Sequence, residues 1–153
     1  MTWPNDFISI IMAVILGGIV GLEREIRGKV AGLRTNILIC LGASVFTIIS
    51  RQMALQYDAS TVRIAAQIVT GVGFLGAGAI IQDTGGIHGL TSAATIWIVA
   101  SIGMACGAQF YQLAIVSTLI VIAVLIGLAK LVKPLEKYQK KQEMIGNADK
   151  RDD

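Results

Sequence analysis

Charged side chains are scarce in this sequence. They make up 15% of its 153 residues, whereas an average globular domain is about 25% charged. Hydrophobic residues reach 54%, and the mean hydropathy is +0.70. This composition argues against a water-soluble domain, so we expect a lipid bilayer to surround most of the chain.

Residues that carry chemistry are few as well. His88 is the only histidine, and the two cysteines, Cys40 and Cys106, lie in apolar runs without metal-ligand spacing. There is no Ser, His and Asp set, no metal-binding cluster and no Walker loop. We therefore expect a protein that is not an enzyme, with no metal and no cofactor, in which both cysteines are small buried residues and His88 is a loop residue without a special role.

The charged residues that do occur are separated by long uncharged runs. The last run, residues 84–129, holds 46 residues without Asp, Glu, Lys or Arg, and a helix needs about 20 residues to cross the hydrocarbon. This run therefore contains two crossings with a turn near residues 107–112. The sequence predicts an all-α transmembrane bundle over residues 1–130, followed by a basic cytoplasmic tail, 131–153. The expected spans lie near 6–22, 35–50, 64–82, 90–108 and 112–129.

Lys and Arg are distributed unequally between the two sides of these spans. With the N-terminus outside, eleven of them fall on the inner side and two on the outer side. Cytoplasmic loops carry the excess of basic residues, so we predict a multi-pass protein of the bacterial plasma membrane with the N-terminus outside and the C-terminus inside.

A glycine-rich stretch, "TGVGFLGAGAI" at residues 70–80, has the G-x-G-x-x-G spacing of a dinucleotide-binding loop. Such a loop should follow a strand, open a soluble helix and precede an acidic residue by about 20 positions. This stretch lies in an uncharged run, and no acidic residue occurs between Asp83 and Glu136. We expect no nucleotide and no nucleic acid as a ligand.

We interpret these glycines as helix-packing residues, because small side chains let membrane helices approach closely. Gly71 and Gly78 share one face of the third span, and Gly73 and Gly76 share nearly the opposite face. We therefore predict that this span is central, with both faces in contact. The first span and the fourth span are each predicted to pack through a single face of small residues. These are Gly17, Gly18 and Gly21 in the first span and Gly103 and Gly107 in the fourth. The bulky fifth span is expected to face lipid.

The stretch "GLEREIRGKVAGLRTN", residues 21–36, concentrates two acids and four bases. Glu23 with Arg27 and Glu25 with Lys29 have the favourable i,i+4 order, which is typical of a solvated helix end. The alternative is a polar site. In that case Thr35 or Asn36 could cap the second span, and Asp83 and Thr91 would lie within reach of Arg24 or Arg34. On the outer side, Arg63 and Gln67 either cap an interface or form the outer end of a polar path.

Several of these stretches resemble the membrane domain of the MgtC/SapB family of bacterial inner-membrane proteins. They are "GGIVGLEREIRGKVAGLRTN", "GASVF", "RIAAQIVTGVGFLGAGAII" and "GLTSAATIW". The resemblance implies about five spans and a shared polar core of Glu23, Arg24, Arg34, Thr35, Asn36, Arg63, Gln67 and Asp83. It also implies links to magnesium limitation, acid stress and survival of pathogens in host cells, and at least one member binds other membrane proteins, including ATP synthase.

The sequence departs from the virulence branch of that family. It ends about twenty residues after the last expected span, so we expect no soluble ACT-like C-terminal domain, and Thr91 replaces an Asn of that branch. The five lysines of the tail either lie on anionic lipid, at about 1 kcal/mol each, or form a partly disordered flank. We expect a homo-oligomer, favouring a dimer, that modulates other membrane proteins; the alternative is a small transporter or channel linked to magnesium or protons.

Overall fold

The computed structural model describes residues 3–57, 62–84 and 86–128. The elements in chain order are α1 (Trp3–Ile26), α2 (Leu33–Tyr57), α3 (Val62–Gly78), β1 (Ile81–Asp83), β2 (Gly86–His88) and α4 (Leu90–Gly107). A further helix covers Tyr111–Leu128. The chain divides into two compact units, Met1–Thr118 and Leu119–Asp153, and α1 to α4 all lie in the first. The predicted all-α helical bundle is confirmed.

Four of the helices are long and apolar enough to cross a membrane. They are Pro4–Ile26, Leu33–Gln56, Leu90–Gly107 and Tyr111–Leu128. The apolar part of α3 is shorter, Ala66–Gly78, because the helix ends four residues before the end of the uncharged run 64–82. The basic tail, residues 131–153, lies outside the described residues.

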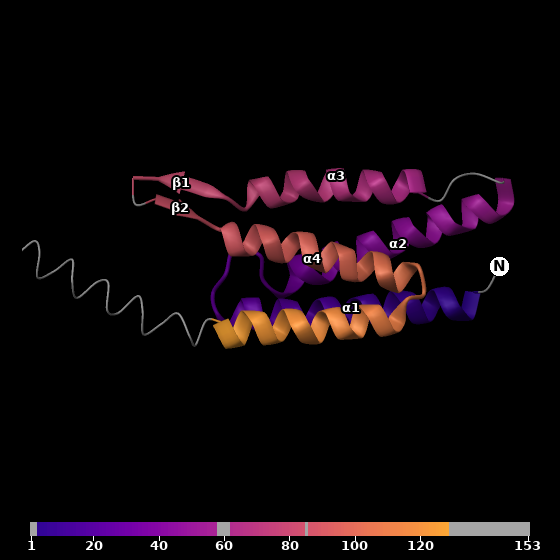
Figure 1. Ribbon diagram of the computed structural model, residues 1–153, viewed down its shortest axis with the longest axis horizontal. Helices are drawn as coiled ribbons and strands as arrows, with labels where there is room; N and C mark the ends of the chain where they lie inside the picture. Colours follow the sequence, from indigo (N-terminus) through magenta and orange to yellow (C-terminus); the bar gives the residue numbers. More distant parts are fainter. Residues whose placement is uncertain (1–2, 58–61, 85, 129–153) are drawn as a thin grey trace, which may run out of the picture. The chain divides into compact units, whose positions relative to one another are not determined.

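A small antiparallel hairpin follows α3, where the sequence predicted helix up to residue 82 and then a loop. Ile81 pairs with His88 and Asp83 with Gly86. The hairpin closes tightly on the end of α3, since a Cβ at Gly89 would lie 1.9 Å from the carbonyl oxygen of Ala79. Gly89 also has φ +87°, which favours glycine. In Figure 1 the hairpin extends from the end of the helices opposite the start of α1.

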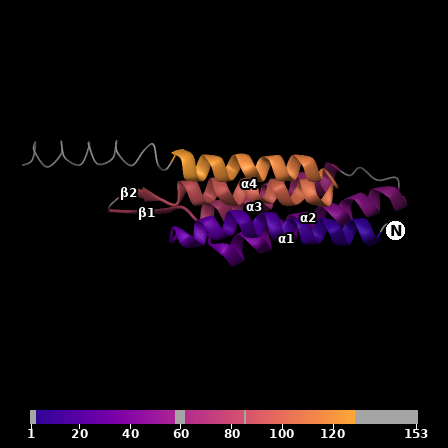
Figure 2. The ribbon, with the colours of Figure 1, turned by 90° about the horizontal axis from the view of Figure 1, so that it is seen from below.

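Two helices, α2 and α4, form the centre of the first unit, because each of them contacts the other three of α1 to α4. Two glycines of α1 and two of α4 face α2, and a Cβ at any of them would meet α2 atoms within 3 Å: Gly17, Gly21, Gly103 and Gly107. We call this three-helix contact the seam. Figure 2 shows α1 alongside α2 from a second direction. The seam holds the buried residues Val20, Cys40 and Cys106; both cysteines are free thiols and are buried, as predicted.

The central placement predicted for α3 is wrong for the single chain. A Cβ at Gly71, Gly73 or Gly78 would have no heavy atom within 4 Å, and only Gly76 approaches another helix, with 3.7 Å to the carbonyl oxygen of Ala93. Beside these glycines, Phe74 is 81% exposed. The glycine spacing correctly marks two smooth faces, but α1 and α4 take the positions beside α2, which leaves most of the α3 surface uncovered.

The last described helix, Tyr111–Leu128, is the least buried of the membrane-length helices, with 11% of its residues buried. Ala114 and Thr118, in its first half, are buried. The apolar residues between them and beyond are largely exposed, as expected for a surface that lipid would cover.

Candidate functional site

A cluster of buried polar side chains lies where α1 ends and α2 begins. Glu23 and Arg24 occupy the last turn of α1, and Asn36 lies in the first turn of α2. Arg24 is 2% exposed and Asn36 is fully buried. Such burial of a charged group is costly without partners. The helices come together here because Gly21 has no side chain; its Cβ would lie 2.9 Å from the Cα of Leu33.

Each member of this cluster has at least one partner. The carboxylate of Glu23 lies 3.5 Å from Nη1 of Arg24 and forms a close ion pair with Nε of Arg27. The side-chain amide of Asn36 donates to the carbonyl oxygens of Ala31 and Gly32, at 2.8 and 2.7 Å. These contacts hold the segment that connects the two helices: Arg27 is bound to the last turn of α1, and Ala31 and Gly32 are bound to the first turn of α2.

The partners do not use all of the hydrogen-bonding capacity. Nε and Nη2 of Arg24, Oδ1 of Asn36 and both carboxylate oxygens of Glu23 are buried and have no hydrogen-bond partner within the described protein, although the Glu23 oxygens are engaged in the two ion pairs. Most buried polar atoms in proteins have one. The cluster therefore offers two guanidinium donors and one amide acceptor to a small polar ligand. It is a poor cation site, because Glu23 already faces two arginines, and the described residues contain no group of three His, Cys, Asp or Glu side chains.

Glu25, one residue further along, caps α2. Its Oε2 accepts a hydrogen bond of 2.8 Å from the backbone N–H of Leu33, the first residue of the helix. The predicted caps, Thr35 and Asn36, are therefore wrong, because both residues lie inside the first helical turn. The predicted pair between Glu25 and Lys29 is not formed either, since α1 ends at Ile26 and Gly28, with φ +61°, turns the chain away.

The remaining inner residues do not join the buried cluster. Arg34 and Thr35 are exposed, and Arg34 forms no ion pair with any described residue. Asp83 lies in the hairpin, where its Oδ1 is 3.4 Å from Nε2 of His88. Thr91 is exposed on α4. Asp83 and Thr91 are both exposed and so do not belong to the buried cluster; their approach to Arg24 or Arg34 stays a prediction.

The two outer residues of the predicted core belong to α3. The side chain of Arg63 lies outside the described residues. Gln67 is exposed and borders an apolar cavity between α2 and α3. The role expected for Arg63 therefore stays a prediction, and Gln67 lies at this cavity and forms no hydrogen bond with the cluster at Arg24 in the described part of the chain.

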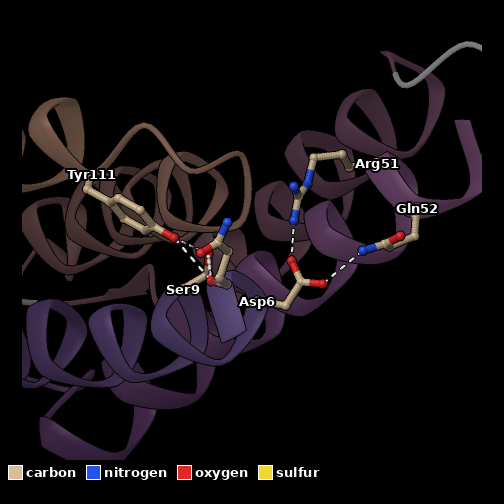
Figure 3. A network of polar contacts seen from close by, with 6 residues as sticks. Asp6, Ser9, Arg51, Gln52 and Tyr111 are labelled. Carbon is tan, nitrogen blue, oxygen red and sulfur yellow. Dashed lines mark hydrogen bonds and ion pairs between the residues drawn. The ribbon is translucent and has the colours of Figure 1, made fainter. Parts of the chain in front are cut away.

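A second polar network lies at the opposite end of α1 and was missed in the sequence (Figure 3). Asp6 forms a close ion pair with Nη2 of Arg51, and its other oxygen accepts a hydrogen bond of 2.8 Å from Gln52. Beside it, the hydroxyls of Ser9 and Tyr111 lie 2.9 Å apart. This network ties the start of α1 to the end of α2 and to the helix that begins at Tyr111.

The missed network had a signal in the sequence. Asp6 opens the first span, and Arg51 follows the second uncharged run directly. Because consecutive short-looped helices are antiparallel, these two charges should meet. The predicted span ended at residue 50 and so left Arg51 in the following loop, whereas α2 continues to Tyr57 and Arg51 belongs to the helix.

Comparison with known proteins connects these residues to one family. The model of the MgtC family matches residues 10–134. The chain is 46% identical over 124 residues to "Protein MgtC" of Brucella abortus (strain 2308), an alignment that covers 81% of the chain and 51% of the relative. It is 46% identical over 126 residues to "Putative magnesium transporter YhiD" of Escherichia coli (strain K12), covering 77% of the chain and 58% of the relative.

A third relative is "Protein MgtC" of Salmonella typhimurium (strain 14028s / SGSC 2262), with 44% identity over 115 residues, 75% of the chain and 48% of the relative. The chain thus spans about half the length of the curated relatives that it matches. No solved structure matches it significantly.

Proposed function

Because the chain belongs to the MgtC family, we propose that it is a non-enzymatic bacterial inner-membrane protein that modulates other membrane proteins during magnesium limitation or acid stress. Membrane-length apolar helices and the family membership indicate a membrane protein. The proposal includes assembly as a homo-oligomer, with a dimer favoured, and a membrane protein such as ATP synthase as the partner.

The observation that carries this proposal is the close packing between the two polar ends. A Cβ at Gly17 would lie 2.6 Å from the Cβ of Cys40, and one at Gly103 would lie 2.1 Å from the Cys40 carbonyl oxygen. Backbones that touch in this way exclude water from the seam. The polar network at Asp6 and the cluster at Arg24 then act as clamps at the two ends of a rigid bundle, whose exposed apolar helices are available to a partner.

A second candidate function is a small transporter. It is favoured by the unsatisfied buried atoms of Arg24 and by a cavity of about 610 Å³ beside Arg51, which Thr47, Ser50 and Ser101 also line. One relative is named a putative magnesium transporter. A conduit would need the bundle to open along or beside the seam.

Flux measurements on the purified full chain in liposomes distinguish the two functions. Vesicles that contain a magnesium-sensitive or a pH-sensitive dye report each ion, with protein-free liposomes as the baseline. We expect wild-type protein to give no flux above that baseline. In parallel, cross-linking in cells grown with low and with ample magnesium should capture a membrane protein that depends on the low-magnesium condition.

The variant Ser101→Leu makes the flux assay specific, because Ser101 lines the cavity beside Arg51 on which the transporter candidate rests. Wild-type flux that disappears in this variant would overturn the modulator proposal. Absence of flux together with a reproducible cross-linked partner would overturn the transporter.

A further inference from the structure

An apolar cavity of about 450 Å³ opens between α2 and α3. Leu38, Gly42 and Phe46 of α2 form one wall, and Gly71 and Leu75 of α3 form part of the other. Gln67 is the only polar side chain among its lining residues. Gly42 and Gly71 leave room in this cavity, because a Cβ at either position would have no heavy atom within 4 Å.

This cavity continues into a second one, of about 350 Å³, toward the start of α2. The two share Leu38, Ile39 and Leu75, and the second is also lined by Arg34 and Thr35. Together they form a groove, which we call the α2/α3 groove, that is apolar along its length and carries a guanidinium at one end.

The charge at that end is not neutralised within the described protein. Arg24 and Arg27 pair with Glu23, and Glu25 accepts a hydrogen bond from Leu33. Arg34 is exposed and forms no ion pair in the described part of the chain. A guanidinium binds phosphate oxygens through two parallel hydrogen bonds, so the polar end of the groove is suited to a phosphate group.

The length of the groove matches one membrane leaflet. Arg34 and Phe46 are twelve positions apart on α2, which corresponds to about 18 Å at 1.5 Å per residue. Half of the hydrocarbon core is about 15 Å thick. A free phosphate would leave the apolar part empty, and a helix of a second copy would leave the guanidinium without a partner, whereas an acyl chain with its phosphate fills both.

We propose that the α2/α3 groove binds one anionic phospholipid, with an acyl chain between α2 and α3 and the phosphate on Arg34. Charge counting predicts that this end faces the cytoplasm, where the leaflet is anionic. The proposal does not rest on the modulator function, since either a modulator or a transporter can hold such a lipid.

Native mass spectrometry of the full chain in detergent tests this site, with phosphatidylglycerol, phosphatidylcholine and inorganic phosphate as separate probes. Gly71→Leu places a side chain in the groove, and Gly73→Leu is its matched control, because both glycines face open space but only Gly71 lines the cavity. Arg34→Gln removes the guanidinium, and Lys29→Gln is its control in the same loop.

We expect one phosphatidylglycerol to bind more tightly than phosphatidylcholine. Arg34→Gln should weaken it about tenfold, as for loss of a charge-assisted contact, and Lys29→Gln clearly less. Gly71→Leu should abolish this binding, and Gly73→Leu should retain it.

Three other results would each overturn the proposal. Equal effects of each variant and its control would mean general annular lipid. Phosphate binding that matches lipid binding and is unaffected by Gly71→Leu would mean a simple anion site. A dimer that dissociates in Gly71→Leu but not in Gly73→Leu, without loss of lipid, would mean that a second copy occupies the groove.

Discussion

Two sets of glycines in this chain look alike in the sequence and behave differently in the structure. Gly17 and Gly21 of α1 and Gly103 and Gly107 of α4 lie against α2, and a Cβ at each of them would come within 3 Å of its atoms. On α3, Gly71, Gly73 and Gly78 face open space. Glycine spacing therefore predicts that one face of a membrane helix lacks bulky side chains. It does not predict whether that face is covered by the same chain, by another chain or by lipid.

The largest loss of folding stability is expected for a substitution in the seam. Gly103→Leu would force a side chain against the backbone of Cys40, where even a Cβ would lie 2.1 Å from the carbonyl oxygen. Overpacking typically costs about 1–3 kcal/mol and occasionally more, and we expect at least about 3 kcal/mol because backbone cannot rotate away. The free energy of unfolding, from titration of micellar protein with SDS, measures it. A Gly103→Leu variant as stable as wild type would remove the distinction between the two glycine sets.

A smaller effect is expected where Asp6 fastens α1 to α2. Asp6→Ala leaves Arg51 without its carboxylate, and breaking a buried pair costs about 3–5 kcal/mol. Since the Arg51 side chain is 23% exposed, we expect about 2–3 kcal/mol by the same titration. Asp83→Ala is the control, because its pair with His88 is more than half exposed and surface pairs contribute about 0–1 kcal/mol. Equal losses in the two variants would contradict a clamp at Asp6.

The smallest effect is expected on α3. Gly73→Ala adds a Cβ in open space and removes a helix-weakening glycine, so stability should be unchanged or higher by up to about 1 kcal/mol. The same change at Gly17, whose Cβ would lie 2.6 Å from that of Cys40, should destabilise the protein. Thermal denaturation of both variants in one detergent gives the comparison. Destabilisation by Gly73→Ala would show that this face of α3 is covered after all.

The inner site was partly predictable from sequence. Glu23 and Arg24 were selected because charged residues next to an uncharged run must find partners, and Asn36 as a candidate cap and through the family resemblance; all three are buried at the junction of α1 and α2. Asp83 and Thr91 were assigned to the same place because loops on one side of a membrane were assumed to meet. Asp83 lies in a hairpin that was not predicted, since strand pairing of such short segments leaves little periodicity in the sequence; the reach of both residues to Arg24 or Arg34 stays a prediction.

The sequence by itself determined that a lipid bilayer surrounds the helices, that the fold is all-α and that the chain belongs to its family. The length and spacing of uncharged runs depend only on what a bilayer tolerates. The tertiary structure decided which helices are central, which residue caps α2 and that Asp6 meets Arg51. Those outcomes depend on distances of a few ångströms between backbones that lie far apart in the chain, and residue spacing along one helix carries no information about its neighbour.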